Sequence, residues 1–316
     1  MNADRLKNAT VANYFDVDKL SADLMSWDLN VQPLHPEKPG SHVASIVQIN
    51  GGKFLYDFAS FLITLDHRGA TPPDMYTFSV PQISAGPFWY RGRSYGSNYI
   101  FVQQPGTELH AITPKGFEIF HISLPEADVH RRLQSYGLGQ ARFQKLPKAF
   151  HAPAQLMQDA RSILAKSCWE EGFAKDWIAD DLVDRIVECW LAQEGLTPRR
   201  ETLTVPKAAL EQCLEAVSAG DTVGLDVARI CASTGVSRRA LERAFSEMLG
   251  LGPSTFFKVA RLAEARRKLI NPPDENQTVA NAMFETGFSH VGQFARDYRK
   301  MFGELPSDTL KRVTGA

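Results

Sequence analysis

The sequence predicts a multi-domain α+β protein with a β-rich N-terminal part and an all-α C-terminal part. Three observations support this prediction. The 316 residues are enough for about two domains. Up to about Leu146 the apolar stretches are short and separated by turn formers, and from Ala152 onward they recur at helical spacing. An internal duplication near the C-terminal end has the form of a repeated helical motif.

The first 150 residues are expected to form a small β-barrel or sandwich. Asn50-Gly51 and Lys115-Gly116 are good turn formers, and several prolines break the remaining stretches. Many short strands with regular turns are typical of both architectures. The candidate strands are Ser45–Ile49, Phe54–Tyr56, Phe61–Leu65, Tyr99–Val102 and Phe117–Ile122.

Residues 151–195 are predicted to form two amphipathic helices. Their apolar positions are spaced as one face of a helix requires, and such a pair either covers the barrel or forms a dimer surface. Residues 196–204, which contain Thr197-Pro198, are interpreted as a linker, and 205–316 as a separate helical domain. The apolar faces consist of Leu156, Ala160, Ile163 and Leu164, and of Ile178, Leu182, Ile186 and Trp190.

The duplication relates Val227–Ser237 to Val279–Ser289 at a spacing of 52 residues. Each copy predicts a short helix, a tight turn and a second helix, which is the helix-turn-helix pattern. Gly235 and Gly287 stand where a positive φ is favoured, and Ser237 and Ser289 are candidate N-caps of the second helix. After one inserted residue in the second copy, the match continues through Leu241, Arg243, Phe245, Met248, Leu249, Gly250, Pro253 and Ser254, which pair with Phe294, Arg296, Tyr298, Met301, Phe302, Gly303, Pro306 and Ser307.

The second helix of each copy is predicted to have one buried and one polar face. Arg pairs bidentately with guanine, Gln with adenine, and Glu accepts from cytosine, so the polar faces suit the major groove of DNA. For either helix alone, the alternative is an ordinary charged face exposed to solvent. Because two such faces occur in matched register, the sequence favours helices that read DNA bases. The candidate base-reading residues are Arg239, Glu242, Arg243, Gln293 and Arg296.

A longer helix, about Pro253 to Ile270, is expected to join the two units with basic residues facing outward. Phosphate contacts of this kind add affinity without sequence information. From Arg199 onward there are 17 Lys and Arg against 14 Asp and Glu, so this part is basic although the whole chain has a net charge of −1. The candidate phosphate-contacting residues are Ser237, Arg238, Arg266, His290 and Lys300.

At these positions the chain resembles the AraC/XylS family of transcription regulators. The first unit has the family's pattern in Ser237, Arg239, Leu241, Arg243 and Phe245, and the second in Gly287-Phe288, Phe294-Ala295-Arg296 and Tyr298-Arg299. One departure concerns the usual Ser after the second turn, which is Gly292 here, beside Val291. This departure shifts base reading in the second unit toward Gln293, Arg296 and apolar contact with thymine methyl groups.

The resemblance implies that two recognition helices enter successive major grooves of double-stranded DNA and that the protein contacts RNA polymerase, as activators do. It also implies an N-terminal cupin-like barrel that binds a small effector, and a homodimer. The expected location is the cytoplasm, because the sequence shows neither a signal peptide nor an apolar run that could span a bilayer.

The candidate effector site is the stretch Trp89–Gly96, where two arginines alternate with aromatic residues. Arg91 and Arg93, with Trp89 and Tyr99, are expected to clamp an anionic group such as a carboxylate or a nucleotide phosphate. A solvated hairpin is the alternative for this stretch. For the barrel as a whole, the alternative is a dimerisation module without a ligand.

An enzyme is the less favoured interpretation. No His-x-His pair is present, although His110 and His121 could meet across a hairpin to hold the metal of a cupin oxygenase. The sequence contains neither a Gly-rich phosphate loop nor a nucleophile elbow, and its four cysteines are expected to be reduced. No catalytic residue, metal or cofactor is therefore expected.

Overall fold

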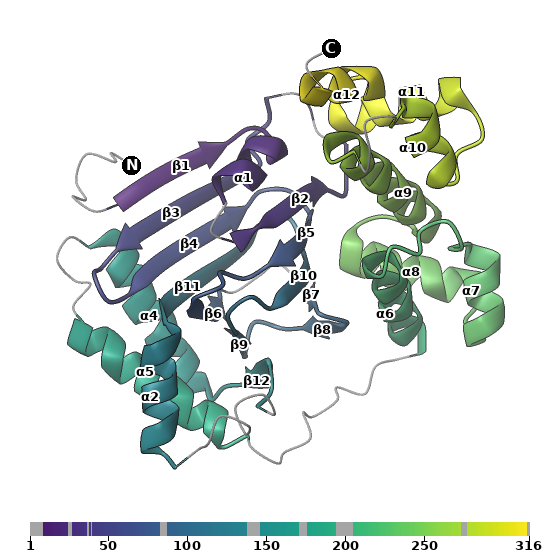
Figure 1. The fold of residues 1–316 in the computed structure, drawn as a ribbon. Helices are drawn as coiled ribbons and strands as arrows, with labels where there is room; N and C mark the ends of the chain where they lie inside the picture. The colour runs from purple at the N-terminus through teal and green to yellow at the C-terminus, as the bar shows by residue number, and fades with distance from the viewer. Residues whose placement is uncertain are drawn as a thin grey trace.

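Two antiparallel sheets form the first half of the chain in the computed structural model, and helices form the second half (Figure 1). The structure describes residues 9–24, 27–36, 38, 40–82, 87–137, 146–170, 176–193, 205–272 and 277–314. The predicted two-part α+β organisation is therefore confirmed. The predicted linker, 196–204, lies outside the described residues.

The larger sheet has seven strands. Among the described strands of this sheet, β3 and β4 are neighbours that follow one another directly in the chain, whereas the other neighbouring pairs join segments further apart. Every pair is antiparallel. Its strands, in spatial order, are β1 (Ala9–Tyr14), β3 (Ala44–Asn50), β4 (Leu55–Phe61), β11 (Phe117–Pro125), β6 (Met75–Pro81), β9 (Tyr99–Gln103) and β12 (Ala149–His151).

The smaller sheet has five strands and faces the larger one across a shared core, so the expected barrel takes the form of two sheets that enclose an interior. Its strands, in spatial order, are β2 (Leu29–Pro33), β5 (Leu65–Ala70), β10 (Glu108–Thr113), β7 (Phe88–Tyr90) and β8 (Arg93–Tyr95). The single strand expected at Phe61–Leu65 is wrong: β4 ends at Phe61, β5 begins at Leu65, and the residues between them form a turn.

Side chains alternate between the two faces of each sheet, as the pleat requires. In β4, Ala59 and Phe61 belong to the core between the sheets. Tyr56 and Phe58 point the other way, into the core beneath the helices. The same alternation in the smaller sheet sends Phe88 and Tyr90 inward, and sends Trp89 outward.

Three helices cover the outer face of the larger sheet: α2 (Glu126–Ser135), α4 (Ala154–Trp169) and α5 (Asp176–Leu191). The apolar faces predicted for the helix pair are those that pack on this sheet, with Leu164 and Trp190 fully buried. Arg132 of α2 forms ion pairs with Asp180 and Asp184 of α5, which joins the two helices. Covering the sheet is thus the observed role of the pair.

The C-terminal domain consists of helices alone. It packs against the outer face of the smaller sheet, on the side of the β domain away from α2, α4 and α5 (Figure 1). Among the described helices, none is both long and apolar enough to cross a membrane. The helices are α6 (Val205–Ser218), α7 (Val227–Thr234), α8 (Arg238–Leu249), α9 (Pro253–Ile270), α10 (Val279–Glu285), α11 (Val291–Phe302) and α12 (Pro306–Thr314).

The smaller sheet has two neighbours, the core on one face and helix α6 on the other. Trp89 and Ile112 share an apolar cluster with Leu210 and Leu214 of α6. Polar contacts frame this cluster: the Ser94 backbone N–H donates to Glu211 Oε1 at 2.8 Å, and Arg68 Nη1 donates to the carbonyl of Val217 at 2.9 Å. A second contact comes from α1 (Val17–Asp23), which packs beside β2 and reaches α9.

Candidate nucleic-acid interface and inner cavity

The first helix-turn-helix unit is formed by α7 and α8. Gly235 ends α7 with φ 69°, a left-handed conformation that glycine adopts without steric cost. Ser237 then caps α8, since its side-chain oxygen accepts from the backbone N–H of Ala240 at 3.3 Å. Both predicted turn residues therefore have the expected roles.

Helix α8 buries one face and exposes the other. Leu241, Ala244, Phe245 and Met248 are buried, as predicted. Arg239, Glu242 and Arg243 are exposed, with 79% of the Arg243 side chain accessible. Arg238 pairs with Glu242 at 2.9 Å and Arg243 with Glu247 at 3.6 Å. Exposed ion pairs of this kind are weak, so these side chains can turn toward another partner at little cost.

The second unit repeats this arrangement in α10 and α11. Gly287 has φ 79° in the turn, and Thr278 caps α10 by accepting from the N–H of Asn281. The expected Ser289 cap is wrong: the residue at the N-cap position of α11 is His290, and its side chain makes no capping hydrogen bond. The first N–H groups of α11 are therefore without a side-chain cap.

Helix α11 exposes the residues predicted to read bases. Phe294, Tyr298 and Met301 are buried, whereas Gln293 and Arg296 are exposed. These two side chains contact each other, because Arg296 Nη2 donates to Gln293 Oε1 at 2.9 Å. Val291, at the start of the helix, is 58% exposed. The face presented outward is therefore Val291, Gln293, Arg296 and Lys300.

Four of the five candidate phosphate contacts are exposed, and one is not. Ser237, Arg238, His290 and Lys300 lie at the surface of the two units. The outward orientation predicted for Arg266 is wrong, since only 4% of its side chain is accessible. Arg266 lies on the side of α9 that faces α1 and α12, where its guanidinium forms ion pairs with carboxylates of the protein itself.

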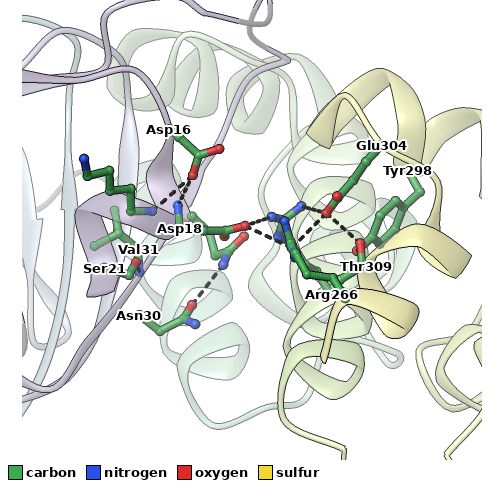
Figure 2. Close-up of polar contacts among 12 residues, drawn as sticks. Asp16, Asp18, Ser21, Asn30, Val31, Arg266, Tyr298, Glu304 and Thr309 are labelled. Atoms are coloured by element: carbon green, nitrogen blue, oxygen red, sulfur yellow. Dashed lines mark hydrogen bonds and ion pairs between the residues drawn. The ribbon is translucent and has the colours of Figure 1, made fainter. Parts of the chain in front are cut away.

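Arg266 is the centre of an ion-pair cluster between the two domains (Figure 2). It pairs with Asp18 of α1 and with Glu304, at 3.3 Å from Nη1 to Oε1. Its guanidinium also lies 4.6 Å from the centre of the Phe302 ring. Thr309 Oγ1 donates to the same Glu304 oxygen at 2.7 Å, which holds that carboxylate in place. The Asp18–Arg266 pair therefore ties the N-terminal domain to α9, the helix between the two helix-turn-helix units.

The two sheets enclose a cavity of about 100 Å³. Most of its wall is apolar, and aromatic rings from both sheets contribute to it. Polar side chains are confined to a few positions, with neither Lys nor Arg among the lining residues of the described part of the chain. The aromatic lining residues are Trp27, Phe61, Phe88, Tyr90, Phe101 and Phe117, and the polar ones are Gln48, Asp57, His67, Ser79, Gln103, Thr113 and His121.

Burial changes the ionisation of three cavity residues. It raises the pKa of Asp57 to about 6, and a hydrogen bond from Gln48 opposes this in part. Burial lowers the pKa of His67 to about 4 and that of His121 to about 3. At neutral pH both imidazoles are therefore uncharged, and Asp57 is the group of the wall that carries charge.

The residues predicted to bind an effector do not line this cavity. Trp89 points away from it, into the cluster with α6. Arg91 and Gly92 form the two-residue turn between β7 and β8, with φ 45° and 83°, as expected of a tight hairpin. Arg91, Arg93 and Tyr99 are likewise absent from the wall. The predicted effector residues therefore lie outside this cavity, whereas Phe88 and Tyr90, the neighbours of Trp89 in β7, face into it.

The approach of His110 to His121 that a metal-dependent enzyme would require does not occur. His110 is on the outer face of the smaller sheet, where its Nε2 lies 2.7 Å from Asp66 Oδ1. His121 is on the inner face of the larger sheet, with Nδ1 2.7 Å from Ser79 Oγ. In the part of the chain that the structure describes, no group of three or more His, Cys, Asp and Glu side chains is arranged to hold a metal ion.

Sequence reasoning missed the polar cavity residues. Asp57 and His121 each interrupt an apolar strand segment, Phe54–Phe61 and Phe117–Leu124. A charged or polar residue at an inward position of a strand is the feature that could have identified them. Such a residue can be recognised only when it is known which side chains of the strand face inward.

The geometry defines a two-unit helix-turn-helix domain attached to a β domain with an inner cavity. Comparisons with known proteins agree with the helix-turn-helix domain. Residues 230–312 match the family described as "Helix-turn-helix domain". The chain is 36% identical over 89 residues to "Probable thc operon regulatory protein" of Rhodococcus erythropolis, covering 28% of this chain and 27% of that protein. It is 30% identical over 113 residues to "XylDLEGF operon transcriptional activator 3" of Pseudomonas putida, covering 36% and 34%.

A solved structure, a probable AraC family transcriptional regulator from Rhodopseudomonas palustris CGA009, shares 39% identity with this chain. It covers 33% of this chain and 96% of its own, with a TM-score of 0.31. The chain spans about a third or less of the length of the two curated relatives above. Residues 230–312 are thus a helix-turn-helix domain similar to those of operon regulators and transcriptional activators.

Proposed function

We propose that this protein is a sequence-specific, DNA-binding transcription regulator. The observation that carries the proposal is the pair of helices α8 and α11, which stand in matched register and expose polar faces of the same kind. A single exposed polar helix face is ordinary, but two such faces, each on the second helix of a unit whose turn contains a glycine with positive φ, fit two successive major grooves. The relatives named above are described as operon regulators and activators, which supports the same function.

In this proposal α8 reads bases with Arg239, Glu242 and Arg243, and α11 with Gln293 and Arg296. Arginine suits guanine, glutamine suits adenine, and the exposed Val291 suits a thymine methyl group. A separate set of groups contacts phosphates: Ser237, Arg238, His290, Lys300 and the uncapped N–H groups at the start of α11. Arg266 is left out, because its guanidinium is buried between two carboxylates.

The β domain is proposed to sense a small molecule in its inner cavity. A barrel that served only as a dimerisation module would need no partly polar interior. The protein is further proposed to act in the cytoplasm as a homodimer that contacts RNA polymerase, and to be an activator, as the Pseudomonas putida relative is described. Residues 1–150, 151–195 and 205–316 would then be the sensor, the helical pair and the DNA-binding domain.

The test is selection of a binding site from random duplex DNA with the full chain, followed by gel shifts at several salt concentrations. Arg243→Ala and Arg296→Ala should each weaken binding to the selected site by about 1–3 kcal/mol and relax one base position. Binding to random DNA should change little. Arg131→Ala is the matched control, since Arg131 is an exposed arginine of α2, on the far side of the molecule.

The proposal fails if no sequence is enriched, or if binding disappears at moderate salt without sequence preference. Equal losses on the selected site and on random DNA would instead make Arg243 and Arg296 phosphate contacts.

A further inference from the structure

The inner face of the larger sheet carries one row of polar side chains. Gln48, Asp57, His121 and Ser79 stand directly opposite one another on β3, β4, β11 and β6. All four line the cavity. On one side of the row the inward neighbours Ile46, Ala59 and Ile119 are apolar, and Phe101 stands beside Ser79 at the end of the row. On the other side, Thr77 and Ser123 hydrogen-bond to each other at 2.8 Å. We call Gln48, Asp57, His121 and Ser79 the polar row.

The hydrogen bonds within the polar row leave acceptors facing the cavity. Ser79 Oγ donates to Gln103 Oε1 at 3.0 Å, so its proton is used. His121 must then donate from Nδ1 to Ser79 Oγ, at 2.7 Å, which leaves Nε2 as an acceptor. Gln48 donates to Asp57 Oδ1 at 2.9 Å. Among the described residues, neither Asp57 Oδ2 nor His121 Nε2 has a partner, and both can accept a hydrogen bond.

The charge of the wall is negative and is not balanced inside the cavity. Asp57 is ionised above about pH 6, both histidines are neutral, and the described lining contains neither Lys nor Arg. A carboxylate or phosphate would therefore meet repulsion and no cation. A protonated amine would pair with Asp57 and stack against aromatic rings, whose faces attract cations.

The size of the cavity limits the ligand to about one ring. Its volume is about 100 Å³. A cavity of roughly 150 Å³ lined by apolar side chains accepts benzene. The cavity of this protein is smaller than that, so one ring is the upper limit, and the lining side chains must move apart slightly to admit it.

We propose that the inner cavity binds a small aromatic or alicyclic amine, with the ammonium group on Asp57 and a second donor hydrogen on His121 Nε2. This inference rests on the proposed function of the β domain as a sensor. It differs from the anionic ligand expected from Arg91 and Arg93: neither arginine lines the cavity, and the Arg91 side chain is engaged by a hydrogen bond with Tyr90 of the wall.

The test is calorimetric titration of the full chain at pH 7.5 with four probes of one shape: benzylamine, benzyl alcohol, toluene and benzoate. Benzylamine should bind about tenfold or more tightly than benzyl alcohol, and benzoate should not bind. Asp57→Asn should remove the preference for the amine. Asp74→Asn, which removes the same charge from an exposed turn, should leave it unchanged.

Two further variants locate the ligand. Ala111→Leu, which fills the cavity from β10, should weaken all binding, whereas Ala240→Leu on α8 should not. Any of three results would overturn the inference: benzoate binds as tightly as benzylamine, the Asp57→Asn variant keeps the preference for the amine, or none of the probes binds. Site selection on DNA is measured separately, so a failure here with an intact selected site leaves the DNA-binding proposal standing.

Discussion

Replacing Asp18 by Asn tests whether the interdomain ion pair holds the two domains together. Asp18 and Arg266 are far apart in the chain, and their side chains are 29% and 4% accessible. Removing one partner of a buried pair typically costs about 3–5 kcal/mol. Glu304 remains beside Arg266, and Asp18 is partly solvated, so the expected loss is smaller, about 1–3 kcal/mol.

Hydrogen exchange followed by mass spectrometry measures this loss locally, because it reports the opening of individual elements. Protection should fall in α1 and α9 and remain unchanged in α4 and α5, which lie on the other side of the β domain. Asp16→Asn is the matched control: it removes the same charge from the same helix, and asparagine preserves the cap that Asp16 provides.

A double-mutant cycle with Arg266→Met isolates the pair itself. The double variant should be less impaired than the sum of the single variants, because methionine needs no carboxylate partner. Equal losses of protection in Asp16→Asn and Asp18→Asn, or full additivity in the cycle, would refute the reasoning and reduce the contact to an incidental one.

Three further predictions concern the fold and its pH dependence. Phe245→Ala, a fully buried ring of the first unit, should cost about 3–5 kcal/mol in chemical unfolding, while Ser246→Ala on the exposed face should cost little. Gly235→Ala should destabilise the first unit by about 1 kcal/mol, because φ is 69° there, and should weaken operator binding more than Gly292→Ala, whose φ is not positive. Between about pH 4 and 6 the folded chain holds a proton on Asp57 that the unfolded chain releases, so Asp57→Asn should raise stability above pH 6. In the same variant the free energy of unfolding should fall more steeply on acidification, by about 1.4 kcal/mol per pH unit, because proton uptake by the buried histidines on unfolding is no longer offset by Asp57. The free energy of unfolding is measured by urea titration at several pH values, and an unchanged dependence on pH would contradict the raised pKa of Asp57.

The helical domain could be predicted closely from the sequence because its evidence is local and duplicated. Gly235 and Gly287 end helices, and Leu241 and Phe294 begin buried stripes, all within one or two turns of each other. The β domain was predicted only as a class. Its strand pairing joins segments far apart in the chain, as with β12 and β9, and short apolar runs do not reveal their partners.

The site predictions failed where a residue's orientation depended on another domain. Arg266 has the composition and spacing of a surface arginine, and only the position of α1 shows that it is buried. Trp89 and Arg91 looked like a binding cluster because they are adjacent in sequence, yet neighbouring residues of a strand face opposite sides. Asp57 was overlooked for the same reason, since its inward direction follows from the register of β3, β4 and β11.

The smaller sheet is a single layer of strands, and its two faces pack against different parts of the protein. One face borders the inner cavity, and the other contacts helix α6. On β5, His67 borders the cavity, while its neighbour Arg68 holds the carbonyl of Val217 in α6. On β7, Phe88 and Tyr90 face the cavity, and Trp89 between them faces α6. Insertion or deletion of a single residue in either strand would exchange the two sets of side chains. Evolution toward a new ligand is therefore confined to substitutions at every second position, and the intervening positions must continue to fit the helix behind them.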